Sequence, residues 1–191
     1  MIRYATILVV MLPGLACAGW KPVDASKPVS PGKAGFSVVL PEDWLYDTDS
    51  NSVSASHDGP PLNGIYIQIA PHKKVFRDSK KVSTPQTTPE DLAEDFIADV
   101  QVGPGALPDV VVVSNEPAEL AGKPAFRVHL RYRAQESSGG AQIESVTLGT
   151  ALESGVMLAS YRAPSIHFFG RWVAVFDEAA KSITLITPPK H

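Results

Sequence analysis

The sequence predicts an α+β protein in which an antiparallel β-sheet carries helices packed on its faces. Short segments alternate apolar and polar residues with the period of a β-strand, and two longer segments repeat apolar residues at helical spacing. Three of the strand segments follow one another with only turns between them, which favours an antiparallel meander. The chain has 191 residues, which favours one domain, and its 17 prolines favour many turns over a helix bundle.

The N-terminal residues 1–18 have the pattern of a secretory signal peptide. Arg3 supplies a positive charge, residues 4–12 are mostly apolar, and residues 16–18 present the small side chains of a cleavage site. The apolar stretch is far shorter than the ~20 residues that a membrane-spanning helix needs. We therefore expect an exported protein, periplasmic or secreted, whose mature form begins at Gly19.

Cys17, the single cysteine of the sequence, supports an alternative in which the protein is a lipoprotein. Residues 14–17 resemble a lipobox, although Gly14 stands where an apolar residue is usual. Under this interpretation Cys17 carries the lipid and anchors the protein to the bacterial envelope. We expect no contact with a membrane other than this lipid.

Residues 19–35 contain three prolines and predict an extended or disordered tether, and residues 36–187 predict a single domain. Trp44 follows a turn that returns it toward the core. The three isoleucines of residues 64–70 share one face of a strand. The strands predicted in this part of the domain are residues 36–40, 52–56 and 64–70.

A helix is predicted to begin at Pro89. Thr88 is a good N-cap, Pro89 fits the first helical position, and Asp91 lies where a capping box needs an acidic residue. Gly103 and the proline after it end the helix. Its apolar stripe consists of Leu92, Phe96, Ile97 and Val100.

The second half of the domain predicts four strands and a terminal helix. The valine run at positions 110–113 favours a strand that is buried on both faces. The apolar residues of segment 170–186 repeat at helical spacing. The predicted strands are residues 109–114, 125–134, 142–152 and 155–162.

One predicted strand carries a row of basic residues. Residues 125–134 alternate strictly, so four basic side chains line one face and four apolar ones line the other. Such a row can bind phosphates, carboxylates or an acidic partner surface. The alternative is a solvated outer face, balanced by cross-strand carboxylates such as Glu144 or Glu153. The candidate ligand-binding or partner-binding residues are Arg127, His129, Arg131 and Arg133.

Two loops hold further candidate residues. Residues 73–81 carry five basic side chains and form either a second contact surface or a flexible, solvated loop. His57 and Asp58 are adjacent, and we expect them to point apart in a surface turn rather than form an acid–base pair. No G-x-S-x-G motif supports a hydrolase elbow.

Charge and motifs disfavour several classes of function. The formal net charge of −3 disfavours nucleic-acid binding, which relies on a basic surface. The histidines lack metal-ligand spacing, and no calcium-loop pattern is present. Gly122-Lys123 lacks the upstream glycine and the following Ser or Thr of a phosphate loop. We therefore predict no nucleic-acid partner, no metal and no cofactor, and we assign no catalytic residue.

The opening of the domain, residues 35–44, runs Gly-Phe, an apolar strand, Pro and Trp, and the turn at 120–125 leads into a long strand. Together with the middle helix and the late helix, this order resembles PsbP-like domains, and most of all the DcrB-like branch of bacterial envelope proteins. The resemblance implies a sheet between helices and mostly non-enzymatic roles, as assembly factors, accessory subunits or binding partners. No ligand residue of the family matches a position here, so the resemblance implies no site.

Three functions stay open. The leading hypothesis is an accessory or binding protein of the cell envelope that docks a protein partner through its sheet face or the 73–81 loop. The alternatives are a receptor for a small anionic ligand held by the basic strand and a hydrolase whose site is assembled from scattered residues. A flat charged face favours the first, an arginine-lined pocket the second, and a pocket with His, Asp and Ser the third.

Overall fold

The computed structural model describes residues 19–32, 35–60, 62–134 and 140–186. The predicted signal peptide and Cys17 lie outside the described residues. The boundaries predicted for the signal peptide, the tether and the domain stay predictions.

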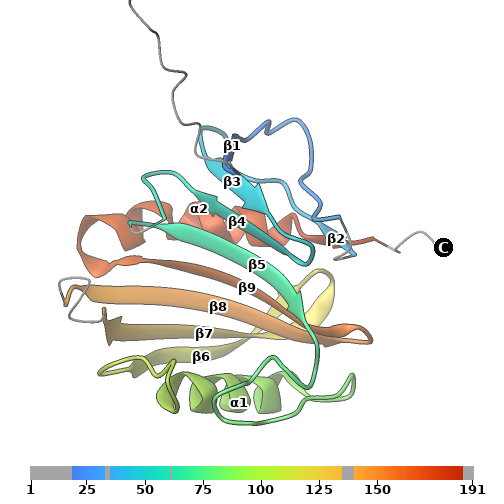
Figure 1. Ribbon diagram of the computed structural model, residues 1–191, viewed down its shortest axis with the longest axis vertical. Helices are drawn as coiled ribbons and strands as arrows, with labels where there is room; N and C mark the ends of the chain where they lie inside the picture. Colours follow the sequence, from blue (N-terminus) through green and yellow to red (C-terminus); the bar gives the residue numbers. More distant parts are fainter. Residues whose placement is uncertain (1–18, 33–34, 61, 135–139, 187–191) are drawn as a thin grey trace, which may run out of the picture.

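An eight-stranded antiparallel sheet organises the chain (Figure 1). Its order is β1-β3-β4-β5-β9-β8-β7-β6, so the predicted meander is present as β7, β8 and β9, and β5 pairs with β9. Helices α1 and α2 lie on opposite faces, which confirms the predicted α+β class. The strands are β1 (Lys21–Pro22), β3 (Leu45–Thr48), β4 (Ser52–Ser56), β5 (Gly64–Ala70), β6 (Val111–Leu120), β7 (Lys123–Arg133), β8 (Gln142–Leu152) and β9 (Gly155–Pro164).

Helix α1 (Pro89–Gln101) begins where the capping residues predict. The backbone N–H of Asp91 donates to Thr88 Oγ1 at 3.2 Å, which satisfies one of the donors that a helix N-terminus leaves free. The helix packs against β6, β7 and β8, and the apolar side chains of β7 face it. The buried core beneath it comprises Phe76, Leu92, Ala93, Phe126, Val128, Leu130, Tyr132, Val156 and Leu158.

Helix α2 (Gly170–Lys181) follows an irregular turn, η2 (Ser165–Phe169), and covers the opposite face of the sheet. Phe176 of the helix stacks on Tyr161 of β9, with 6.0 Å between the ring centres. The core on this side is the larger of the two and also contains Trp44 and the apolar residues of β4 and β5.

The C-terminal helix is shorter than the predicted segment 170–186, because it ends at Lys181 and Ser182 forms its C-cap. Ser182 Oγ donates to the carbonyl of Ala179 at 2.7 Å and accepts the N–H of Val39 at 2.9 Å, so the chain turns toward residues 36–39. There β10 (Thr184–Leu185) pairs with β2 (Phe36–Ser37) in a separate two-stranded sheet. The predicted strand 36–40 therefore supplies two residues of this small sheet and none of the main sheet.

The prediction that the valine run is buried on both faces is wrong. β6 is the last strand of the sheet, so it has a neighbour on one side only, and its side chains are largely exposed. Val111 is 56% exposed, and the ladder with β7 shifts register between Val112 and Ser114. Bulges and prolines are common in edge strands, where they hinder pairing with another chain. β6 contains such a proline, Pro117.

Part of the predicted tether lies extended along the domain. Lys21–Pro22 pairs with β3, a strand that the sequence pattern did not indicate. Val23 donates its N–H to the carbonyl of Trp44 at 2.9 Å, and Val29 forms a bridge with Val38.

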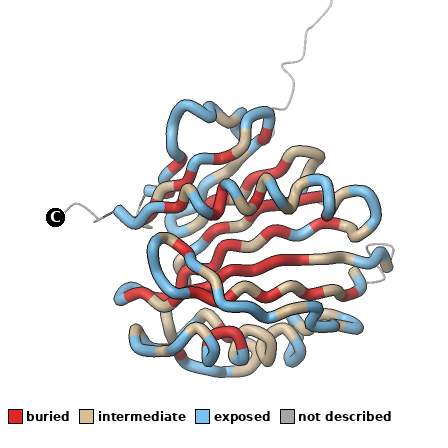
Figure 2. The backbone as a smooth tube through the Cα atoms, turned by 180° about the vertical axis from the view of Figure 1, so that it is seen from behind, coloured by how far each residue is buried: buried red, intermediate tan, exposed pale blue. Residues whose placement is uncertain are grey.

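Buried residues concentrate in the central strands, whereas the edges and loops are exposed (Figure 2). None of the described helices is both long and apolar enough to cross a membrane.

Candidate functional site

Half of the sheet face that carries α1 has no helix over it. α1 contacts β6, β7 and β8, so the same face of β4, β5 and residues 160–162 of β9 has no described helix over it. Side chains alternate along β4 and β5, and Ser52, Ser54, Tyr66 and Gln68 point to this face, whereas Val53, Ala55, Ile65 and Ile67 point toward α2 and are buried. On β9 the face changes along the strand: Val156 and Leu158 belong to the core beneath α1, and Ser160 and Arg162 lie beyond it. The register places the polar ones side by side: Ser54 beside Tyr66, Tyr66 beside Ser160, and Gly64 beside Arg162.

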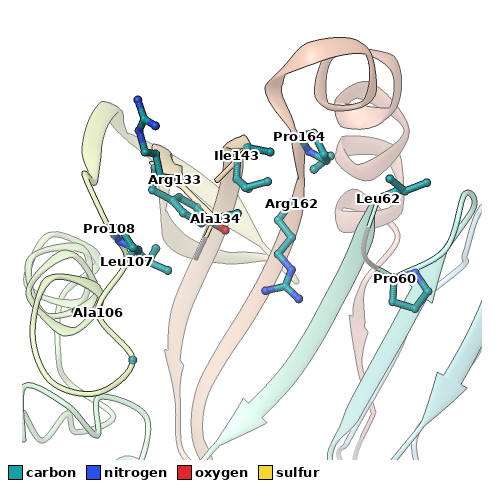
Figure 3. A pocket seen from close by; sticks show the side chains of 14 residues that line it. Pro60, Leu62, Ala106, Leu107, Pro108, Arg133, Ala134, Ile143, Arg162 and Pro164 are labelled. Atoms are coloured by element: carbon teal, nitrogen blue, oxygen red, sulfur yellow. The ribbon is translucent and has the colours of Figure 1, made fainter. Parts of the chain in front are cut away.

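A cavity of about 670 Å³ opens at one end of this uncovered face. This volume lies within the roughly 300–1,000 Å³ that small-molecule sites occupy. Two loops form its walls, with Leu107 and Pro108 on one side and Pro60 and Leu62 on the other (Figure 3). Arg162 extends from β9 between these walls. The remaining lining residues are Gly105, Ala106, Tyr132, Arg133, Ala134, Ala141, Ile143, Ala163 and Pro164.

A second, shallower hollow of about 380 Å³ adjoins the first, and Arg162 lines both. Its other lining residues come from β4 and β5 and are uncharged: Ser52, Val53, Ser54, Tyr66, Ile67 and Gln68. The two hollows share Arg162, and we call them together the Arg162 cleft, with apolar loop walls at one end and hydroxyl and amide groups at the other.

Arg162 differs from the other arginines of the meander in its partners. Its guanidinium carbon lies 4.9 Å from the centre of the Tyr66 ring, and its Nη2 donates to Tyr66 Oη at 3.3 Å. Within the described part of the chain, no carboxylate oxygen lies within 4.0 Å of its guanidinium nitrogens. Burial raises the pKa of Tyr132 on the cleft floor, and the positive charge of Arg162 opposes that rise. The cleft thus holds a cation whose field is not cancelled by a neighbouring described carboxylate.

Gly64 makes the contact between Arg162 and Tyr66 possible. It lies opposite Arg162 in the β5–β9 ladder, and the Tyr66 side chain passes over it. A Cβ atom at position 64 would lie 2.5 Å from Tyr66 Oη and 2.6 Å from Tyr66 Cε2, closer than real Cβ contacts occur. The glycine therefore leaves the space in which the tyrosine ring lies flat beneath the guanidinium.

The structure pairs each of the predicted basic-strand residues with a carboxylate. Arg127 Nη1 lies 2.7 Å from Asp177 Oδ1 of α2, and Arg133 Nε lies 3.3 Å from Asp109 Oδ2. Glu144 on β8 serves two of them, at 2.7 Å from His129 Nε2 and 3.8 Å from Arg131 Nε.

The alternation predicted for this strand is confirmed, and so is Glu144 as a cross-strand partner. The expectation of a solvated outer face is wrong for two residues, because this face looks toward α2. Arg127 is paired with the helix, and His129 stacks on Phe169 with 5.1 Å between the ring centres. Their role in binding a ligand or partner stays a prediction.

His57 and Asp58 do not point apart as expected. His57 Nδ1 lies 2.9 Å from Asp58 Oδ1. Asp58 Oδ2 accepts from Asn63 Nδ2 at 2.6 Å and from Trp172 Nε1 at 2.9 Å. The His57 ring packs against the Trp172 ring at 4.4 Å and edge-on against Trp44.

Both oxygens of Asp58 are therefore occupied. Burial favours the neutral carboxyl, but the hydrogen bonds from His57 and Trp172 outweigh it and hold the pKa of Asp58 below its ordinary value. In the described structure, no hydroxyl group is hydrogen-bonded to the other ring nitrogen of His57. The cluster ties the loop after β4 to α2 and has the geometry of a structural lock.

The basic loop at 73–81 is partly anchored. Phe76 is buried under α1 and forms a bridge with Lys81, whose Nζ lies 3.6 Å from Asp95 Oδ1. Asp99 Oδ1 accepts the N–H groups of Asp78 and Ser79, each at 2.8 Å. Across the described residues, no group of three or more His, Cys, Asp and Glu side chains is arranged to hold a metal ion.

Sequence reasoning missed Arg162, Tyr66 and the loop walls. Their position in the cleft depends on the pairing of β5 with β9, two strands that lie about 90 residues apart in the chain. The sequence shows that the segments of β5 and β9 carry polar residues, but it does not show that these two strands are neighbours.

No protein-family model matches the sequence, and no curated protein matches it. Several solved structures match the fold of the chain. The solution structure of cyanobacterial PsbP (CyanoP) from Synechocystis sp. PCC 6803 superposes with a TM-score of 0.54 at 13% identity, covering 93% of this chain and 98% of that one. A variant of the protein Mog1 superposes with a TM-score of 0.56 at 7% identity, covering 84% of this chain and 95% of that one. At these identities the likeness shows the fold, and the chain has the fold that PsbP and Mog1 share.

Proposed function

We propose that the chain is an exported, non-enzymatic binding protein of the bacterial cell envelope, and that its ligand or partner places an anionic group at Arg162. The observation that carries the proposal is the position of Arg162, at the junction of two hollows and, within the described chain, without a carboxylate within 4.0 Å. A guanidinium is a planar donor that matches carboxylate and phosphate groups, and it is always charged.

The lining of the cleft supports binding rather than hydrolysis. The larger cavity is lined by apolar residues, glycine, tyrosine and two arginines, so its described lining has no Ser, Cys, His, Asp or Glu to act as nucleophile or base. The His57–Asp58 pair has its carboxylate occupied by Trp172 and Asn63.

Residues 1–18 support export of this protein to the envelope, with Cys17 as the alternative lipid anchor. The resemblance to the DcrB-like branch of bacterial envelope proteins agrees with this location, and we propose that the chain belongs to that branch. The shared fold with PsbP supports the non-enzymatic role that the resemblance implies.

A protein partner that docks on the basic strand is the second candidate. Arg131 and Arg133 have side chains that are 43% and 66% exposed, so an acidic partner can displace their present carboxylates. This candidate predicts that binding depends on the basic strand and not on Arg162.

The test uses cells that express the tagged full-length chain, and compares the exported protein with two variants. Arg162→Glu reverses the charge in the cleft. Arg171→Glu is the matched control, because Arg171 also stacks on an aromatic ring, at 4.7 Å from the centre of Trp172. Proteins and small molecules retained from envelope extract are identified by mass spectrometry.

We expect a molecule that the native protein and Arg171→Glu retain and that Arg162→Glu loses. Retention that is identical in all three proteins would contradict the proposal. Loss in an Arg127→Glu/Arg131→Glu variant, with retention in Arg162→Glu, would favour the basic strand instead.

A further inference from the structure

We infer that the ligand of the Arg162 cleft is a carboxylate joined to an apolar chain. This inference rests on the proposed function and specifies the chemistry of its ligand. Three features of the cleft carry it: the apolar walls, the single uncompensated cation, and the uncharged polar floor beside that cation.

The walls of the larger cavity are apolar and stand partly open to solvent. Leu62 is 40% exposed, and Leu107, Ile143 and Pro164 are half-buried around the same space. Figure 3 shows these side chains on both sides of the gap above Arg162. Water in contact with such walls is displaced favourably by an alkyl chain, at about 25 cal/mol per Å² of apolar surface.

The charge of the cleft matches one negative charge. Arg133 also lines the cavity, but it is paired with Asp109 and its guanidinium points away from Arg162 (Figure 3). Arg162 has five N–H groups, of which one donates to Tyr66 Oη, and its guanidinium also acts on the Tyr132 hydroxyl. A carboxylate carries a single charge and fits the guanidinium edge with two parallel hydrogen bonds. A phosphate monoester carries about −1.5 to −2 and would leave charge unmatched here.

The floor beside Arg162 supplies groups for the oxygens of the carboxylate and repels no anion. Tyr66 lies beneath the guanidinium, and Ser54 and Gln68 follow it in the second hollow. Neither described lining contains Asp or Glu. A carboxylate at Arg162 therefore meets hydroxyl and amide groups on one side, while its chain extends between the loop walls.

Isothermal titration calorimetry on the exported protein, recovered from cells expressing the full-length chain, tests the inference with decanoate as the probe. Hexanoate tests the contribution of the chain, decanol tests the charge, and decyl phosphate tests the alternative headgroup. The variants are Arg162→Gln, Arg162→Lys and the control Arg171→Gln, and thermal melting confirms that each is folded.

We expect decanoate to bind at least tenfold more tightly than hexanoate, since full burial of each methylene corresponds to about fourfold in affinity. Arg162→Gln should weaken decanoate binding about tenfold or more, Arg162→Lys should weaken it less, and Arg171→Gln should leave it unchanged.

The inference is overturned if decanol binds as well as decanoate, if chain length has no effect, if decyl phosphate binds more tightly, or if the two arginine positions respond alike. Arg162-dependent retention of another molecule from envelope extract would then leave the proposed function standing. If neither decanoate binding nor retention of a molecule from envelope extract depends on Arg162, the proposed function is contradicted as well.

Discussion

The Tyr66 ring lies beneath the Arg162 guanidinium at 4.9 Å, and its Oη accepts a hydrogen bond of 3.3 Å from Nη2. This contact sets the direction of the arginine in the cleft. Tyr66→Phe keeps the ring and removes the acceptor, so we expect decanoate affinity to fall about twofold to tenfold, the range for one neutral hydrogen bond. Calorimetry measures the change, and an unchanged affinity would show that the hydroxyl does not orient Arg162.

Gly64→Ala tests the contact between Tyr66 and Arg162 through the residue over which the Tyr66 side chain passes. The added methyl group meets the end of the Tyr66 side chain, which is half-buried and can turn outward, so the cost in stability should stay below about 1 kcal/mol. Ligand affinity should fall at least as far as in Tyr66→Phe. Gly170→Ala is the matched control, because no atom lies within 4 Å of a Cβ added there. A variant that binds normally would contradict the role given to Gly64.

Trp172→Phe tests the lock around Asp58. The change removes one of the two hydrogen bonds that lower the pKa of this carboxyl, so the pKa should rise toward its ordinary value. A carboxyl whose folded pKa is lowered stabilises the protein above its unfolded pKa of about 3.9, and this contribution disappears as the pH falls through the folded pKa. We expect the variant to lose about 1.5–3 kcal/mol at neutral pH.

Urea unfolding at neutral pH and at a pH below the folded pKa of Asp58 separates the two losses in this variant. The loss of indole packing is the same at both pH values, whereas the loss of the hydrogen bond to the charged carboxylate is confined to neutral pH. A difference between native and variant protein that does not shrink in acid would show that Trp172 acts through packing alone. Asp58→Asn, which cannot ionise, is the control.

A double-mutant cycle on Arg127 and Asp177 measures what the basic strand contributes to stability. The pair is 26% and 34% exposed at 2.7 Å, so we expect a coupling free energy near the upper end of surface pairs, about 1 kcal/mol. Decanoate binding should be unchanged in Arg127→Ala. A coupling near zero together with reduced binding would mean that Arg127 serves a ligand rather than α2.

Local rules predicted the elements whose neighbours are close in sequence. The start of α1 followed from Thr88 and Pro89, and the two faces of β7 followed from strict alternation. The failures concern tertiary context. Four valines in a row predicted a central strand, but β6 lies at the edge of the sheet. Whether a strand lies at an edge depends on how the other strands pair.

The candidate site was predictable only in its chemistry. An arginine that binds an anion was expected, but on β7, where four basic residues stand in a row. In the fold, that row meets Asp177, Glu144 and Asp109, whereas Arg162 contacts Tyr66 and has no carboxylate within 4.0 Å among the described residues. Carboxylate partners come from distant segments, so a row of charges in the sequence does not show which charge stays free.

The most direct test of the Arg162 cleft is NMR of the arginine Nε–H groups in the exported protein during titration with the anionic fraction of envelope extract. We predict that the Arg162 signal shifts and saturates while the Arg127, Arg131 and Arg171 signals stay in place. Shifts at Arg127 and Arg131 with a stationary Arg162 signal would contradict the account and assign the anion to the basic strand.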